Sequence, residues 1–252
     1  MIFVPYLLFS RRRRAAAVAL AAFAATAAIG YALLPGDSQR FWGGLFLDSH
    51  RVGGCCAPVN RSLRGAILRL APSADSGLVL GIAIVTGIVG VTLAVLASRR
   101  GDDAMGFSRC AITGLLVSPV SWTHHWTLAV PALLVLGARV SERRAKTGVI
   151  AFAAVVLVAF SYLPKLMQKP GFLPPSHLPL GWALASAPYV LIGVVALVVA
   201  GLQETARWAD AVGRTPHPTR SSRVLFRLAP TRARSYAAWN SGDGQALISN
   251  GR

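Results

Sequence analysis

Long uncharged apolar runs constrain this chain more than any other feature of its sequence. Three of them cover residues 15–34, 77–97 and 182–202, and none contains Asp, Glu, Lys or Arg. About 20 consecutive apolar residues form a helix long enough to cross the hydrocarbon core of a bilayer. Since 54% of the 252 residues are hydrophobic, an ordinary soluble domain is excluded. We therefore predict an all-α fold, a polytopic transmembrane helix bundle.

A further apolar segment, residues 109–138, has an unusual length and an unusual centre. It is too long for one straight span and too short for two complete ones. Its middle reads Ser-Pro-Val-Ser-Trp-Thr-His-His-Trp, from Ser118 to Trp126. Pro119 lacks a backbone N–H and biases Ser118 away from helical geometry. The segment is thus predicted to be a broken or hairpin span, followed by a further span over residues 147–163.

Basic residues predict the orientation of these spans. The net charge is +17, and the short connections at residues 11–14, 99–100 and 139–146 are rich in arginine. The positive-inside rule places these connections on the cytoplasmic side. Residues 1–202 would then form the membrane domain, with outer loops at 35–76 and 164–181, and residues 203–252 a basic, mostly disordered cytoplasmic tail. No nucleic-acid-binding motif accompanies the arginines, so we expect contact with membrane lipids and no nucleic acid.

His124 and His125 are the first candidate catalytic residues, because ionisable side chains within apolar membrane segments are costly and often functional. Adjacent histidines on a helix point about 100° apart, so they do not chelate one ion together, and we expect no metal and no cofactor. One histidine facing a cavity would contact a phosphate, a sugar hydroxyl or a catalytic carboxylate. Alternatively, both cap the broken helix beside Trp122 and Trp126, which would lie in the outer aromatic belt.

The outer loop contains a second candidate region, from Asn60 to Leu70. Leu63, Ile67 and Leu70 recur at helical spacing and predict a short interfacial helix. The arginines of the same stretch would either clamp a phosphate or contact phospholipid headgroups; they are Arg61, Arg64 and Arg69.

Three carboxylates of the outer loop are available as a catalytic base, and these are Asp37, Asp48 and Asp75. Asp37 stands in a Pro-Gly-Asp-Ser turn, where a helix-capping or turn-capping role is the better interpretation.

Three motifs carry a resemblance to a known family: Pro35–Ser38, Asn60–Gly65 and above all Ser118–Trp126. Together they resemble the polyprenol-phosphate-mannose-dependent alpha-1,2-mannosyltransferases, which are actinobacterial, membrane-embedded glycosyltransferases of the C class. The resemblance implies transfer of mannose from a polyprenyl-phosphate-mannose donor to a lipid-linked mannoside or mannan at the outer face of the plasma membrane.

The resemblance also implies site residues. His124 or His125 would lie near the acceptor or act as the base, and Asn60, Arg61 and Arg64 would lie near the donor phosphate. Arg61 departs from the Asn-Gln-Ser that is usual in the family.

The resemblance extends from Met1 to about Leu202 and corresponds only to the C-terminal part of such an enzyme. The family's presumed catalytic aspartate belongs to an external loop upstream of this part. A truncated reading frame, a separately encoded N-terminal half or a decayed remnant would each explain this, and we expect the chain to be inactive alone. Two alternatives remain: a non-catalytic membrane subunit or transporter-like protein, and a membrane-surface binder acting through its basic tail.

Overall fold

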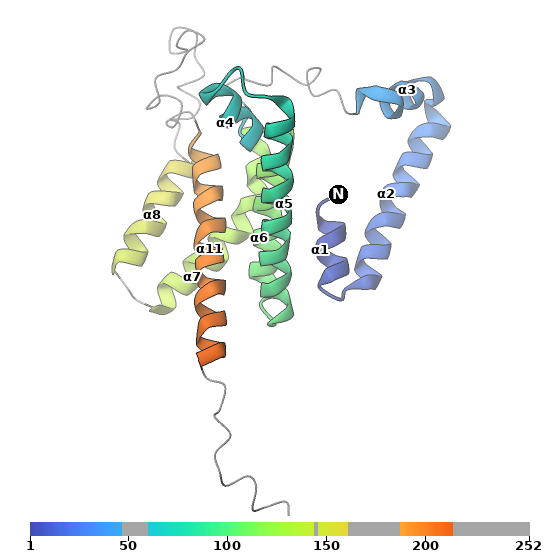
Figure 1. Cartoon of the computed structure of the whole chain (residues 1–252). Coiled ribbons are helices and arrows are strands. Elements are labelled where there is room, and N and C mark those ends of the chain that lie inside the picture. Colours follow the sequence, from blue (N-terminus) through green and yellow to red (C-terminus); the bar gives the residue numbers. More distant parts are fainter. Residues whose placement is uncertain (47–59, 144–145, 161–186, 214–252) are drawn as a thin grey trace, which may run out of the picture. The chain divides into compact units, whose positions relative to one another are not determined.

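The fold is all-α, as predicted. The computed structural model describes residues 1–46, 60–143, 146–160 and 187–213. Contacts divide the chain into two units, Met1–Arg207 and Trp208–Arg252, and the first contains the core and the site. In chain order the described elements are α1 (Phe3–Phe9), α2 (Arg13–Leu33), α3 (Pro35–Arg40), the π-helical turn η1 (Phe41–Leu45), α4 (Leu63–Leu70), α5 (Ser76–Arg99), α6 (Asp103–Val117), the 3-10 helix η3 (Thr123–Ala129), α7 (Val130–Arg143), α8 (Lys146–Phe160) and α11 (Pro188–Gly213) (Figure 1).

Three of the described helices, α2, α5 and α11, are long and apolar enough to cross a membrane. Two of them cover nearly the same residues as the predicted spans 15–34 and 77–97. The start of α5 is fixed by Asp75, whose Oδ1 accepts a hydrogen bond of 3.0 Å from the backbone N–H of Leu78. Asp75 is therefore a helix cap, whereas Asp37 lies in the first turn of α3, where its negative charge favours the helix dipole.

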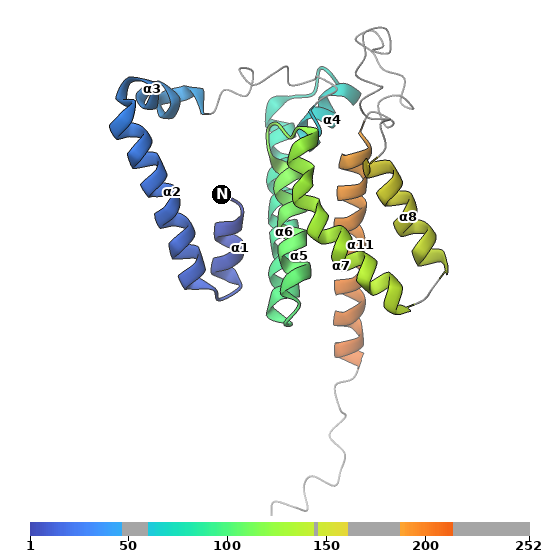
Figure 2. The same ribbon diagram turned by 180° about the vertical axis from the view of Figure 1, so that it is seen from behind.

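The helices α5 and α6 form a close antiparallel pair, visible in both views (Figures 1 and 2). Gly90 of α5 faces Thr113 of α6, and a Cβ atom at Gly90 would lie 2.1 Å from the Thr113 Oγ1 atom. A glycine is therefore required at this point for the two helices to approach. This pair is a scaffold: α1 and α4 pack against both of its helices, and the broken segment packs against α6.

The central segment is broken, as predicted. α6 ends at Val117, residues 118–122 are non-helical, and η3 leads into α7 (Figure 2). Ser118 adopts φ −58° and ψ 136°, the extended geometry that a following proline favours. The polypeptide thus turns back beside the end of α6.

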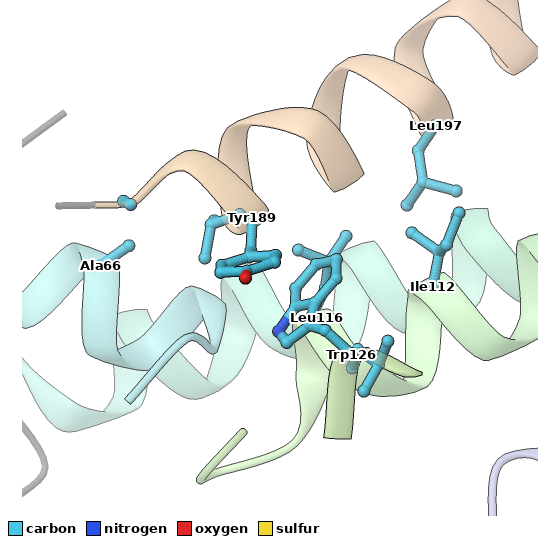
Figure 3. Close-up of a cluster of buried hydrophobic side chains, with 9 residues drawn as sticks. Ala66, Ile112, Leu116, Trp126, Tyr189 and Leu197 are labelled. Atoms are coloured by element: carbon cyan, nitrogen blue, oxygen red, sulfur yellow. The ribbon is translucent and has the colours of Figure 1, made fainter. Parts of the chain in front are cut away.

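Two sequence predictions are corrected, one in the broken segment and one at the end of α11. First, Trp126 does not lie in an outer aromatic belt: it is buried among Leu116, Tyr189 and other apolar side chains of α6 and α11 (Figure 3). Its ring centroid lies 5.3 Å from that of Tyr189. An aromatic residue facing a neighbouring helix gains more burial than one facing lipid headgroups, and sequence spacing alone does not distinguish the two cases.

Second, α11 begins at Pro188 and continues to Gly213, so residues 203–213 are helical and not part of a disordered tail. Pro and Gly are absent between Gln203 and Val212, and Glu204 pairs with Arg207 one turn later at 3.3 Å. Both features favour continuation of the helix. The remaining tail 214–252, the predicted outer loop 164–181 and the last residues of the predicted span 147–163 lie outside the described residues.

Ion pairs join α6 to α7 and α11 near the turn between α5 and α6. The carboxylate of Glu204 pairs with Arg109 at 3.1 Å and also with Arg100. Asp102, the N-cap of α6, pairs with Arg139 of α7. Burial opposes ionisation of this carboxyl, but the hydrogen bond and charge of Arg139 hold the pKa of Asp102 below its usual value. This end of the unit Met1–Arg207 is called the basic end below.

Candidate functional site

The two sequence motifs of greatest interest meet at the other end of α6. Asn60 lies two residues before Ser62, the N-cap of α4, and its amide bonds to the backbone of the broken segment. Its Nδ2 donates to the Pro119 carbonyl at 3.2 Å, and its Oδ1 accepts from the backbone N–H of Ser121 at 3.1 Å. The Asn60 side chain is buried. One amide therefore satisfies backbone groups of a proline-broken segment that no helix can satisfy.

Ser62 and Gly65 complete the junction. The Ser62 Oγ caps α4 by accepting from the Gly65 backbone N–H at 3.2 Å, and it donates to the Pro119 carbonyl at 3.3 Å. The Asn60 Oδ1 also accepts from the Ser62 backbone N–H at 3.1 Å. A Cβ atom at Gly65 would lie 2.7 Å from the Asn60 backbone oxygen. Asn60, Ser62 and Gly65 therefore depend on one another: the first two through hydrogen bonds, and Gly65 because a side chain there would collide with Asn60.

The structure buries Arg61 and Arg69, two of the three predicted phosphate ligands of this stretch, at 0% and 5% exposure. The guanidinium carbon of Arg61 lies 5.9 Å from the ring centroid of Tyr189, within the range of a cation–π interaction. Burial lowers the pKa of the Arg61 guanidinium, and a Coulombic interaction with Tyr189 opposes this shift. Arg69 donates from Nη1 to the Asn60 carbonyl at 2.9 Å. Both side chains therefore point into the junction, while Arg64 is half-buried at its surface.

Trp126 ties the junction to the core. Its Nε1 donates to the Arg61 carbonyl at 3.3 Å, and its ring packs against Tyr189 (Figure 3). The backbone N–H of Arg61 donates in turn to the carbonyl of Ser121. The broken segment, the start of α4 and the start of α11 are thus held together by a few directed contacts.

His124 and His125 lie on the exposed side of this junction, in the first turn of the 3-10 helix η3. The Nδ1 atom of His125 accepts a hydrogen bond of 3.1 Å from the Trp122 backbone N–H. In a neutral imidazole whose Nδ1 accepts, the proton resides on Nε2. His125 is therefore a cap of η3 that presents an Nε2–H donor outwards. The capping role considered from the sequence for both histidines is observed for His125.

Three aromatic rings define the geometry around the histidines. The His125 ring lies parallel to that of Trp122, with an interplanar angle of 4° and centroids 6.1 Å apart. His124 approaches His125 edge to face at 4.4 Å. Within the described residues no group of three His, Cys, Asp or Glu side chains is placed to hold a metal ion. The arrangement offers hydrogen-bond donors and acceptors on an aromatic surface.

The structure places the predicted site residues in two layers. Asn60 and Arg61 are buried in the junction, and Arg64, His124 and His125 lie at its surface. Of the three carboxylates considered as a base, Asp37 lies in the first turn of α3 and Asp75 caps α5. Asp48 lies outside the described residues. Sequence reasoning assigned no role to Tyr189, which stands in no recognisable local pattern, or to Ser121, whose role within the Ser118–Trp126 motif depends on a hydrogen bond to the distant Asn60.

Comparison of the sequence with known proteins shows which family the chain resembles. The model of glycosyltransferase family 87 matches residues 1–119, which include the Asn60 motif. A polyprenol-phosphate-mannose-dependent alpha-(1-2)-phosphatidylinositol mannoside mannosyltransferase of Mycobacterium tuberculosis is 32% identical over 228 residues, or 87% of this chain and 52% of the relative. Over residues 1–119 the chain is similar to glycosyltransferase family 87. It is a membrane protein, and the resemblance inferred from its motifs is confirmed.

Two further relatives have similar names. A phosphatidylinositol pentamannoside mannosyltransferase of Mycobacterium tuberculosis with the same donor dependence is 32% identical, covering 74% of this chain and 43% of the relative. A phosphatidylinositol mannoside mannosyltransferase of Mycolicibacterium smegmatis is 29% identical, covering 73% and 44%. The chain thus spans about half the length of the curated relatives that it matches. No solved structure shows significant similarity to it. These names favour a glycosyltransferase over a transporter-like protein.

Proposed function

We propose that this chain forms part of a membrane glycosyltransferase that transfers mannose from polyprenyl-phosphate-mannose to a lipid-linked mannoside. The observation that carries the proposal is the junction of Asn60–Arg61–Ser62 with Ser118–Trp126, because it brings together two of the three motifs on which the family resemblance rests. The junction would face the outside of the plasma membrane, and the basic end would face the cytoplasm, in accordance with the positive-inside rule.

Donor binding is assigned to the start of α4. The departing polyprenyl phosphate needs positive charge and N–H donors where its own negative charge develops. Arg64, at the surface, would bind the phosphate directly. Arg61 and Asn60 lie beneath it, so Arg61 would contribute positive potential and Asn60 would fix the backbone that carries Arg64.

The two histidines receive different roles in the acceptor site. Because the Nδ1 of His125 already accepts from the Trp122 backbone N–H, His125 would donate from Nε2 to an acceptor hydroxyl or to a phosphate oxygen. His124 would then be the residue nearer to the acceptor proton. Transfer requires a base on the acceptor hydroxyl, and His124 supplies it or hydrogen-bonds a carboxylate that does.

Mannose transfer in isolated membranes tests the proposal. The host should lack the related mannosyltransferases, and the donor should be radiolabelled polyprenyl-phosphate-mannose with phosphatidylinositol mannosides as acceptors. The chain is expressed alone in one arm. In a second arm it is co-expressed with the N-terminal half of the Mycobacterium tuberculosis relative, because the chain spans 52% of that protein. His124→Ala and His125→Ala variants accompany both arms.

Transfer in either arm that falls at least tenfold in the His124→Ala variant supports the proposal. A well-inserted chain that transfers no mannose in either arm contradicts it. Retention of full transfer by both histidine variants would leave the enzyme class intact and overturn the assignment of the histidines.

A further inference from the structure

An apolar groove of about 580 Å³ runs between α1 and one face of α5. The polar end of the groove is Arg99, where α5 ends beside the basic end, at the opposite end of α5 from the Asn60 junction. The lining residues are Ile2, Pro5 and Phe9 of the N-terminal segment and Ile84, Gly87, Ile88, Val91, Thr92, Val95, Leu96 and Arg99 of α5.

The α5 side of the groove is a continuous stripe. Its members recur at intervals of three and four residues, so they share one helical face. From Ile84 to Arg99 the stripe is about 22 Å long at 1.5 Å per residue. The hydrocarbon region of one leaflet is about 15 Å deep, half of a bilayer core of about 30 Å. The groove therefore covers the depth of one leaflet and ends near its headgroups.

The side chains along the apolar length of the groove leave no hydrogen-bonding group unsatisfied. Thr92 is the only hydroxyl-bearing residue among the described lining residues, and its Oγ1 donates to the Ile88 carbonyl at 2.8 Å. Ile84 and Ile88 remain 52% and 63% exposed. A hydrocarbon chain laid along the stripe would cover these side chains without leaving a polar group unsatisfied.

Positive charge is concentrated at one end of the groove. Arg99 lines it, and its Nε donates to the Phe9 carbonyl at 2.9 Å, which holds the guanidinium beside the end of α1. The turn after α1 continues with Arg11–Arg14. Arg11 adopts φ 63°, a left-handed conformation for which glycine is the usual residue. A basic side chain thus occupies a position that the backbone alone would assign to glycine.

We propose that the groove binds the acyl chain of an anionic glycerophospholipid, with the lipid phosphate at Arg99. The volume of the groove favours a hydrocarbon chain over a helix. A helix about 10 Å wide and 22 Å long occupies on the order of 1,700 Å³, about three times the groove. The polyprenyl sugar donor is disfavoured because the Asn60 junction, which is assigned to its phosphate, lies at the opposite end of α6.

Lipid retention measured by native mass spectrometry tests this site. The chain is reconstituted in nanodiscs containing equal amounts of phosphatidylglycerol and phosphatidylcholine with matched acyl chains, and the lipids that remain bound on release are counted. We expect about fivefold enrichment of phosphatidylglycerol, the factor that corresponds to about 1 kcal/mol for one arginine at a lipid phosphate.

Two variants test the acyl-chain site and the headgroup site separately. Ile88→Trp fills the groove and should abolish retention of either lipid; the matched control is Val89→Trp, on the same helix but outside the groove lining. Arg99→Gln should lower the enrichment to about onefold; its control is Arg40→Gln in α3, which changes the net charge equally. Gel filtration and thermal unfolding verify that each variant is folded.

Equal retention of the two lipids by the unaltered chain would overturn the proposal, as would Ile88→Trp retaining phosphatidylglycerol. A lipid-free dimer of the protein that disappears in the Ile88→Trp variant would identify a second protein copy as the occupant of the groove, and would also overturn the proposal. Preferential capture of added polyprenyl phosphate over phosphatidylglycerol would reassign the groove to the donor.

Discussion

The two ends of α6 are held by different kinds of interaction. At the Asn60 junction, neutral hydrogen bonds between a buried amide, a hydroxyl and backbone groups hold a broken helix in one conformation. At the basic end, carboxylates pair with arginines that range from buried to well exposed. Buried neutral networks have fixed geometry and are costly to break, whereas exposed ion pairs contribute little and weaken in salt. The first kind suits a site that must position side chains, and the second suits a surface that contacts lipid.

Asn60→Ala should have the largest effect. It leaves the Ser62 and Ser121 N–H groups and the Pro119 carbonyl without the Asn60 amide, and each buried polar group left unsatisfied costs about 1–3 kcal/mol. Because such losses are not additive, we expect about 3 kcal/mol lower free energy of unfolding in detergent. Gln39→Ala is the control, since this exposed amide bonds only the Tyr31 hydroxyl in the described contacts; it should change stability by less than about 0.5 kcal/mol. Equal effects of the two variants would contradict a junction held by Asn60.

Glu204→Gln should have the next largest effect. The Glu204 and Arg109 side chains are 9% and 7% exposed, and removal of one charge from a buried pair is costly. Glutamine keeps an acceptor, and Arg109 also donates to the Leu93 carbonyl, so we expect a loss of about 2 kcal/mol. Arg207→Ala removes the exposed partner of the same carboxylate and should cost less than about 0.5 kcal/mol.

Salt sharpens this prediction. Raising the ionic strength from 0.1 to 1 M shortens the Debye length from about 10 to about 3 Å. The stability difference between Arg207→Ala and the unaltered chain should vanish at high salt, while that of Glu204→Gln should persist. Loss of both differences at high salt would show that the Arg109 pair is solvated.

Gly65→Ala should have a smaller effect that depends on close packing. A Cβ at this position meets the Asn60 backbone oxygen at 2.7 Å and the Asn60 Cγ at 2.8 Å, and such overpacking costs about 1–3 kcal/mol. Alanine recovers about 1 kcal/mol of helix propensity, so we expect a net loss of about 1 kcal/mol. Gly81→Ala in α5 meets nothing within 4 Å and should be neutral or stabilising. Thermal unfolding of the two variants side by side measures the difference.

Arg11→Gly should have the smallest effect, and its sign is opposite. The backbone N–H groups of Arg11 and Arg12 donate to the carbonyls of Leu8 and Leu7, the bonding pattern of a helix end with a left-handed residue. Glycine adopts this conformation without steric cost, so we expect stability to rise by about 0.5 kcal/mol. A loss of stability would mean that the Arg11 side chain makes a contact worth more than the strain of its backbone.

The long helices could be predicted because their cause is local. Each apolar run of the α2 and α5 regions is sufficient to define a span, and Pro119 is sufficient to break the central segment. The end of α11 was predicted too early because hydropathy falls after Leu202, while Glu204 and the absence of proline continue the helix. At this point the sequence becomes polar after Leu202, whereas the helix continues to Gly213.

The candidate site was only partly predictable, because its bonds join residues far apart in sequence. Asn60 and Ser121 are 61 positions apart, and Trp126 and Arg61 are 65 apart. The motifs could be recognised separately, but their pairing follows from how α5 and α6 pack. The burial of Arg61 against Tyr189 is likewise a tertiary effect, since an arginine before an interfacial helix is ordinarily expected at the surface.

Photochemical labelling by the donor tests the central claim most directly. A polyprenyl-phosphate-mannose analogue with a photoreactive group near its phosphate is incorporated into membranes that contain the chain, and labelled peptides are mapped by mass spectrometry. Labels within residues 60–70 and 118–126, reduced by Arg64→Ala and competed by unmodified donor, are the predicted result. Competable labels confined to the basic end around Arg99 and Arg109, or no competable label in a folded chain, would contradict a donor site at the Asn60 junction.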